Sequence, residues 1–271
     1  MNNSLTLDSP TASRATPVPG GEGRLSFVYT HGVYHGSWAF SQLHPLLAVY
    51  AGKQYLIDLR GHYGDRRVHP EDNIGYTEYM WDLYTELDQI PGQKLLVGHS
   101  LGGLLSMSAL SRDDVVGAVL LATPLPAVIK NKRWSLLFRY PVKSLAMIID
   151  RDAAHLYHDK VWARRYLFSA STPSDIFDVA FDRIRLQNEP FHLFDDINEL
   201  VIDDTDMAKP VMVIAGSEDP TVDEDAARML AERFDVTPLV IQGAGHDLML
   251  EPEYAVQLTQ KIAFWLNEQG L

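Results

Sequence analysis

Ser100 lies among glycines in the segment GHSLGG, between sequence typical of a strand and sequence typical of a helix. The segment matches G-x-S-x-G, in which a strained turn exposes a serine hydroxyl above a sheet. Glycine is expected beside the serine because a Cβ there would collide with the neighbouring strand and helix. A phosphate-binding loop is disfavoured, since neither G-x-x-x-x-G-K-[ST] nor G-x-G-x-x-G occurs in this segment. We therefore predict that Ser100 is a nucleophile.

An acid and a base follow Ser100 along the chain. Asp219 lies in VMVIAGSEDPTV, and His246 lies in the glycine-containing segment VIQGAGHDLMLEPE. An imidazole with an ordinary pKa near 6.5 can take the serine proton at neutral pH, and a carboxylate can hold that imidazole in the required tautomer. The order serine, acid, histidine is the expected one for such a turn. We predict Asp219 as the acid and His246 as the base, and we expect Asp247 to be a cap or surface residue.

Backbone donors for a developing oxyanion are predicted at two places. One is the amide of Leu101, directly after the serine, and the other is the amide of Val33 in YTHGVYHGSW. The side chain of His31 is expected to order that loop, whereas His35 could face substrate or pack. Together with His99, these histidines are candidate substrate-binding residues. A metal is not expected, because no carboxylate accompanies them at ligand spacing, and the chemistry needs no cofactor.

Short apolar segments alternate with amphipathic segments along the chain. Near-continuous hydrophobicity in short runs is typical of parallel strands that are covered on both faces. Alternation of such strands with helices predicts an α/β protein with a doubly wound, mostly parallel sheet. The predicted strands are 25–30, 54–58, 94–98, 115–123, 211–216 and 238–243, and the predicted helices are 76–90, 101–111, 223–234 and 253–269.

Composition excludes several classes of protein. The 271 residues carry a formal net charge of -13, which disfavours binding to nucleic acid or to anionic lipid. The absence of cysteine excludes disulfides, thiolate metal sites and a cysteine nucleophile. No secretory leader and no apolar run of about 20 residues is apparent, so we expect a cytoplasmic protein without a membrane span. The partner expected is a small-molecule acyl substrate, and the oligomeric state is left open.

The alternation of strands and helices breaks in a long segment before the last third of the chain. This segment has no convincing strand and is rich in aromatic residues, most of which are expected to pack a helical subdomain. A minority, for which Trp134 and Trp162 are the candidates, could line an apolar substrate pocket. We divide the chain into a flexible N-terminal lead-in at 1–23, a core at 24–123 and 210–271, and a helical cap inserted at 124–209.

With these residues in place, the chain resembles the α/β-hydrolase fold superfamily from residue 25 to its end. Five segments carry the resemblance in the family's order: HGVYHGSW, LIDLRGHYGD, LLVGHSLGGLLS, VMVIAGSEDPTV and GAGHDLMLEPE. The resemblance implies a variable cap inserted after the sixth strand of the fold. It also implies the same nucleophile, acid, base and oxyanion donors, namely Ser100, Asp219, His246, Val33 and Leu101.

Two features depart from the family pattern. The family usually opens with a strand hairpin, but only the strand-poor lead-in precedes Leu25, so this sheet edge is expected to be shortened or irregular. In RGHYGDRRVHP, Tyr63 is inserted and charged residues follow it. The loop from Tyr63 to Arg67 could simply be longer, which we favour, or could place charge near the mouth of the site.

The resemblance implies a hydrolase that cleaves an ester, thioester or lactone of a small, largely apolar substrate through an acyl-enzyme on Ser100. Acyl transfer or cyclisation, and C–C bond hydrolysis or a lyase reaction, are alternatives that would use the same triad. Haloalkane dehalogenase chemistry is disfavoured, because it needs aspartate where Ser100 stands. The alternative from a different class is a non-catalytic, hydrolase-like binding protein, whose signature would be the loss of a triad member.

Overall fold

The computed structural model describes residues 13–64, 67–126, 138–201 and 208–271. A seven-stranded sheet in the order β1-β3-β2-β4-β5-β6-β7 forms the centre of the molecule. All neighbouring strands are parallel except β1 and β3, which confirms the predicted α/β class and the mostly parallel sheet. The strands are β1 (Arg14–Val18), β2 (Ser26–Thr30), β3 (Lys53–Asp58), β4 (Lys94–His99), β5 (Val115–Leu121), β6 (Val211–Gly216) and β7 (Leu239–Ile241).

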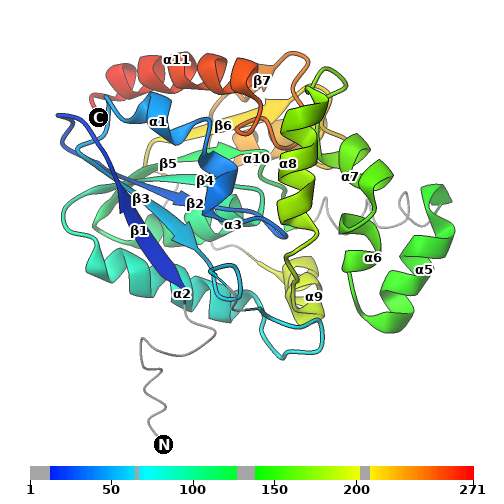
Figure 1. The fold of residues 1–271 in the computed structure, drawn as a ribbon. Helices are drawn as coiled ribbons and strands as arrows, with labels where there is room; N and C mark the ends of the chain where they lie inside the picture. Colours follow the sequence, from blue (N-terminus) through cyan, green and yellow to red (C-terminus); the bar gives the residue numbers. More distant parts are fainter. Residues whose placement is uncertain (1–12, 65–66, 127–137, 202–207) are drawn as a thin grey trace, which may run out of the picture.

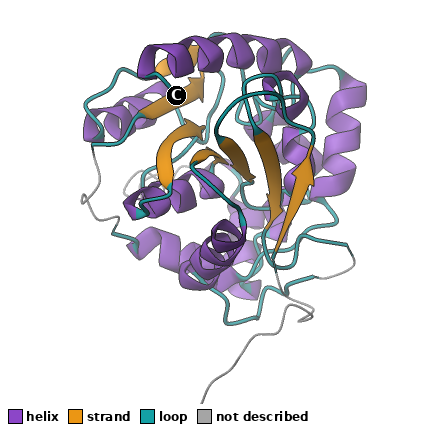
Figure 2. Cartoon of the chain, turned by 90° about the vertical axis from the view of Figure 1, so that its left-hand side faces the viewer, coloured by secondary structure: helices purple, strands orange, loops and turns teal. Residues whose placement is uncertain are grey.

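Helices cover both faces of the sheet (Figure 2). Alternate residues of β4 enter different apolar clusters: Leu96 packs with the helices α2, α3 and α10, whereas Leu95 and Val97 pack with α1 and α11. This two-sided burial explains why the strands are almost continuously apolar. No helix in the described ranges is both long and apolar enough to cross a membrane. The covering helices are α1 (His44–Leu47), α2 (Tyr76–Gln89), α3 (Leu101–Ser108), α10 (Glu224–Arg233) and α11 (Pro252–Gln269).

Helices without an intervening described strand connect β5 to β6 and lie beside the sheet (Figure 1). They form an aromatic core of their own, in which Trp162 and Phe177 pack together with Tyr34 and Leu250 from the sheet side. The exact limits of the cap, 124 and 209, stay a prediction. Its described helices are α5 (Pro141–Asp150), α6 (Ala154–Tyr157), α7 (Lys160–Leu167), α8 (Ser174–Ile184) and α9 (Phe191–Glu199).

The first strand corrects the prediction of a flexible lead-in over 1–23. Arg14–Val18 form β1, which pairs antiparallel with β3. Glu86 of α2 supports this edge, because its carboxylate accepts hydrogen bonds from the Ser13 hydroxyl and the Ala15 amide, both at 2.9 Å. The prediction was wrong for these residues because an edge strand is stabilised mainly by backbone pairing, which leaves no apolar signature. Residues 1–12 lie outside the described part.

Candidate active site

The turn between β4 and α3 holds Ser100 in a strained conformation. Its backbone angles are φ 51° and ψ -113°, and a positive φ is unfavourable for a residue with a side chain. The turn is held on both sides, since the Ser100 amide donates to the Leu121 carbonyl of β5 at 3.0 Å and the Ser100 carbonyl accepts from the Gly103 amide at 3.0 Å. The structure thus gives Ser100 the geometry predicted from the glycine pattern.

Three glycines make room around this turn. A Cβ on Gly98 would lie 2.3 Å from the Gly102 carbonyl oxygen, and a Cβ on Gly102 would lie 2.0 Å from the Thr30 carbonyl oxygen at the end of β2. Both clashes involve backbone atoms, which confirms the predicted steric need for glycine. A Cβ on Gly32 would lie 3.0 Å from the Cβ of Ser100. The loop that follows β2 therefore lies directly against the serine.

Asp219 and His246 meet in a short hydrogen bond. Asp219 follows β6 and His246 follows β7, and the His246 Nδ1 lies 2.7 Å from the Asp219 Oδ2. The second carboxylate oxygen accepts from the amides of Thr221 and Val222 at 2.7 and 2.9 Å. With its proton on Nδ1, the imidazole keeps Nε2 as a base. The His246 ring also contacts the ring of His99, with centroids 4.9 Å apart, so the base lies beside the residue that precedes the nucleophile turn.

The amides predicted as oxyanion donors are available at this position. Within the described part of the chain, no carbonyl or side chain accepts a hydrogen bond from the amide of Val33 or of Leu101. Leu101 is the first residue of α3, where helix amides are unpaired and the helix dipole favours negative charge. Val33 directly follows Gly32, which abuts Ser100. The two amides can therefore serve a negatively charged oxygen formed beside the serine.

His31 is wholly buried and orders the loop after β2, as predicted. Its Nδ1 donates to the Gly32 carbonyl at 2.8 Å, and its Nε2 accepts from the Leu59 amide at 3.1 Å. A second proton on Nε2 would face that N–H donor instead of an acceptor. Burial holds the pKa of His31 well below its usual value, and the nearby His62 lowers it further.

This buried, neutral imidazole predicts an acid-sensitive fold. The pKa of His31 is lower in the folded chain than in the unfolded chain, so below about pH 6.5 the unfolded state binds a proton that the folded state refuses. His31 should therefore contribute about 1.4 kcal/mol of lost stability per pH unit below that point, until its folded pKa is reached. The free energy of unfolding is measured with urea between pH 7 and 5. Its decrease with falling pH should be smaller in His31→Asn than in the wild type, by the equivalent of about one proton. The exposed His69 provides the control His69→Asn; an unchanged slope in His31→Asn would contradict the prediction.

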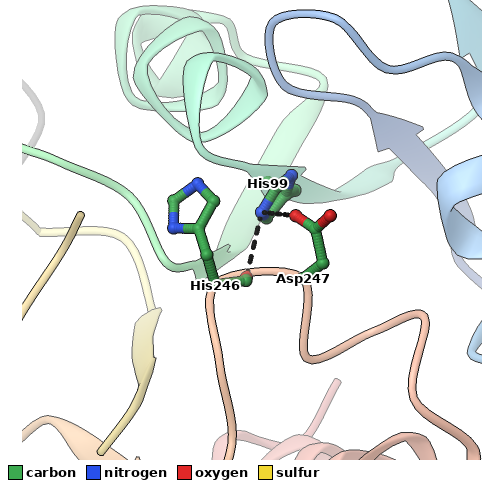
Figure 3. Close-up of side chains that lie close together, drawn as sticks. All are labelled: His99, His246 and Asp247. Carbon is green, nitrogen blue, oxygen red and sulfur yellow. Dashed lines mark hydrogen bonds and ion pairs between the residues drawn. The ribbon is translucent and has the colours of Figure 1, made fainter. Parts of the chain in front are cut away.

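A second group of buried side chains links the loop that carries Val33 to the loop that carries His246. The His35 Nδ1 lies 2.7 Å from the Val33 carbonyl oxygen, and its Nε2 lies 2.9 Å from the Asp247 Oδ2. The His99 Nε2 donates to the His246 carbonyl at 3.2 Å and lies 3.7 Å from the Asp247 Oδ1 (Figure 3). His35 thus fixes the spacing between the two loops.

These contacts correct two expectations from the sequence. Asp247, expected as a cap or surface residue, has an exposed fraction of 0% and bonds to His35. His31, His35 and His99, predicted as candidate substrate-binding residues, are buried and bonded to protein groups. The structure therefore does not support substrate contact by these imidazoles and gives them positioning roles. The burial of Asp247 could not be predicted, because a lone aspartate beside the base carries no signal of burial in the sequence.

Ligand atoms of His99, His246 and Asp247 lie within 4.8 Å of one another, which is close enough for a metal. All three side chains are already engaged in the hydrogen bonds described above, Asp247 through its bond to His35. The His99 Nε2 donates to a carbonyl, so it offers no lone pair, and the His246 Nδ1 faces Asp219. Metal binding through the His99 Nε2 or the His246 Nδ1 would break one of these hydrogen bonds, and we keep the prediction that the site uses none.

The remaining candidates are packed within the cap, lie in the loop from Tyr63 to Arg67, or fall outside the described residues. Trp162 is 3% exposed and stacks on Tyr166 with centroids 4.9 Å apart, so it belongs to the packing of the cap and not to a substrate surface. Trp134 lies outside the described residues. In the loop between Tyr63 and Arg67, the ring of Tyr63 lies under the Arg14 guanidinium of β1 at 4.6 Å. Asp65 and Arg66, whose charges the alternative depends on, lie outside the described residues, so the role of this loop stays a prediction.

The fold and the strained serine turn define a class, the α/β-hydrolases. The Alpha/beta hydrolase family matches residues 27–258, which are most of the chain, so the protein belongs to this family.

The chain is similar to several known proteins. It is 35% identical to "Probable esterase PIR7A" of Oryza sativa subsp. indica over 41% of this chain and 43% of the rice protein, so the match spans less than half of that relative. It is 25% identical to "pFDCC methylesterase MES16" of Arabidopsis thaliana over 84% of this chain and 91% of that protein. A solved structure of a thermophilic esterase from Thermogutta terrifontis has a TM-score of 0.68 at 20% identity, covering 94% of this chain and 93% of that one. This last similarity shows the fold alone.

Proposed function

We propose that this protein hydrolyses carboxylic esters through an acyl-enzyme on Ser100. The observation that carries the proposal is the Asp219 to His246 hydrogen bond of 2.7 Å, together with the contact of the His246 ring with His99, which precedes the strained turn of the serine. A carboxylate that fixes the tautomer of a histidine next to such a serine is the arrangement that nucleophilic acyl transfer needs.

The reaction has two stages. The Ser100 Oγ attacks the ester carbonyl carbon while the His246 Nε2 takes the serine proton, and the carbonyl oxygen becomes an oxyanion that faces the amides of Val33 and Leu101. The intermediate collapses and expels the alcohol, which receives the proton from His246. Water then attacks the acyl-enzyme as His246 takes its proton, and the acid is released as the proton returns to Ser100.

The names of the relatives support an ester of a small alcohol as the substrate class. One is named an esterase and another a methylesterase. The aromatic cap next to the site favours a small, largely apolar acyl group. A thioester or lactone would follow the same chemical steps, so these substrates belong to the test of the proposal.

Labelling and an ester panel test this function together. One portion of the purified chain is treated with a fluorophosphonate, and a separate, untreated portion is assayed against methyl, ethyl and butyl esters of one arylalkanoic acid, the matching thioester and a lactone. We expect labelling at Ser100 and fastest turnover of the methyl ester. Turnover in which an added alcohol replaces water would indicate an acyltransferase. A chain that is neither labelled nor active on any of these compounds would be a binding protein, and the proposal would be wrong.

A further inference from the structure

Glu189 of the cap, in the segment between α8 and α9, is a wholly buried carboxylate. One oxygen accepts from the Tyr34 amide at 2.7 Å, and the other accepts from the Tyr79 hydroxyl at 2.7 Å. The Nε2 of His62, itself buried, lies 3.0 Å from the first oxygen. Burying a carboxylate is costly unless such partners compensate it. Three elements of the core therefore converge on one side chain of the cap.

The most informative partner is Tyr34, which directly follows Val33. Tyr34 has φ 59°, a left-handed conformation that a residue with a large side chain rarely adopts. Its ring is buried and stacks on Tyr157 of the cap helix α6, with centroids 4.2 Å apart and planes inclined by 11°. Both the amide and the ring of Tyr34 are thus held by the cap.

The peptide that joins Val33 to Tyr34 is fixed at both ends. Its N–H is bound by Glu189, and its carbonyl oxygen, that of Val33, is bound by the Nδ1 of His35 at 2.7 Å. The orientation of a peptide plane constrains the backbone rotation of the residue before it. Fixing this plane therefore restricts the direction in which the Val33 amide points.

We infer that Glu189 is a positioning residue for the oxyanion hole: from the cap, its carboxylate locks the Val33–Tyr34 peptide so that the Val33 amide points at the oxyanion. The inference rests on the proposed esterase function, in which that amide is one of the two donors. It gives the cap a part in stabilising the transition state in addition to covering the site. Loss of this alignment lowers kcat more than it weakens substrate binding, because the amide acts most strongly on the developing charge.

Two substitutions of Glu189 and one control separate positioning from general stability. Glu189→Met keeps the length of the side chain but removes both acceptor oxygens, whereas Glu189→Gln keeps an oxygen for the Tyr34 amide. The control is Glu86→Met, since Glu86 is also buried and also accepts from an amide and a hydroxyl, but at the edge strand β1. Steady-state kinetics on the best ester, and affinity for a trifluoromethyl ketone whose serine adduct carries an oxyanion, are measured for all variants.

We expect Glu189→Met to lower kcat about 100-fold with KM changed less than about threefold, and to weaken the ketone in parallel with the loss in kcat/KM. Glu189→Gln should recover most of kcat, and Glu86→Met should keep the wild-type kcat. Equal kinetics for Glu189→Met and Glu86→Met, or a kcat loss without weaker ketone binding, would overturn the inference.

If Glu189→Met does not fold, Glu189→Asp decides, because it keeps the charge but withdraws the oxygens by one bond: a roughly tenfold loss of kcat supports positioning, and an unchanged kcat overturns it. A wild-type chain without esterase activity would refute the proposed function itself, and that result is visible before any Glu189 variant is compared.

Discussion

Replacing Ser100 by alanine is expected to lower kcat on the best ester by about six orders of magnitude, the size of effect seen when a triad loses its nucleophile. The reason is that an alanine side chain has no oxygen to form the acyl bond, while the amides of Val33 and Leu101 still assist only a slow attack by water. The fold should survive, because the strained turn is held by backbone hydrogen bonds to Leu121 and Gly103, which the substitution leaves in place. The measurement is steady-state hydrolysis combined with fluorophosphonate labelling, which should disappear.

The control for this prediction is Ser111→Ala. Ser111 ends the 3-10 helix after α3 and is exposed, and its hydroxyl donates to the Ser108 carbonyl. It should keep the wild-type rate and the label. Retained labelling or turnover in Ser100→Ala, with a fold that matches the wild type by circular dichroism, would assign the nucleophile to another residue.

Asp219→Asn should lower kcat by about four orders of magnitude without displacing the side chain. One oxygen of Asp219 accepts from the amides of Thr221 and Val222, so the carbonyl oxygen of the new asparagine would be held in the same place. Its NH₂ group would then face the Nδ1 of His246. A donor at that position forces the histidine proton onto Nε2, and the imidazole can no longer take the proton of Ser100.

The neighbouring Asp223→Asn is the matched control for Asp219→Asn. Asp223 caps α10 by accepting from the Ala226 amide at 3.0 Å, a role that asparagine fills equally well. It should leave kcat and thermal stability close to the wild type. A pH profile adds a second readout, since Asp219→Asn should regain some rate at high pH, where hydroxide replaces the lost base. Wild-type turnover in Asp219→Asn would show that another group orients His246.

The strands that form the site could be predicted because they are buried on both faces. The run predicted at 94–98 is β4, Lys94–His99, and its neighbours β2 and β5, together with β6 beyond them, were predicted equally well. The edge strand β1 was missed, since RATPV contains a proline and has few apolar residues, and the strand depends on backbone pairing with β3. A pattern of hydrophobicity detects burial, and an edge strand has little of it.

The strained turn at Ser100 and the pairing of Asp219 with His246 could also be anticipated from the loops that carry these residues, whereas their catalytic roles stay predictions. Ser100 and His246 lie in loops that contain glycines, and Asp219 follows a strongly apolar strand. The supporting residues could not be predicted. Glu189 and Tyr34 are 155 positions apart, and His35 and Asp247 are 212 positions apart. A buried charge is indistinguishable from a surface charge in the sequence until the fold brings its partner to it.

The cap is consequently not an interchangeable part of this protein. The resemblance to the family implies a variable cap between β5 and β6, and exchanging this segment between relatives would be a natural route to new specificity. In this chain, a foreign cap without an oxygen at the position of Glu189 would leave the Tyr34 amide buried without an acceptor, at a cost of about 1–3 kcal/mol. Any successful exchange must therefore keep an acceptor oxygen at the position of Glu189 as well as bring the new substrate-lining residues. Selection of caps for new substrates is thus constrained by a residue that need not contact a substrate.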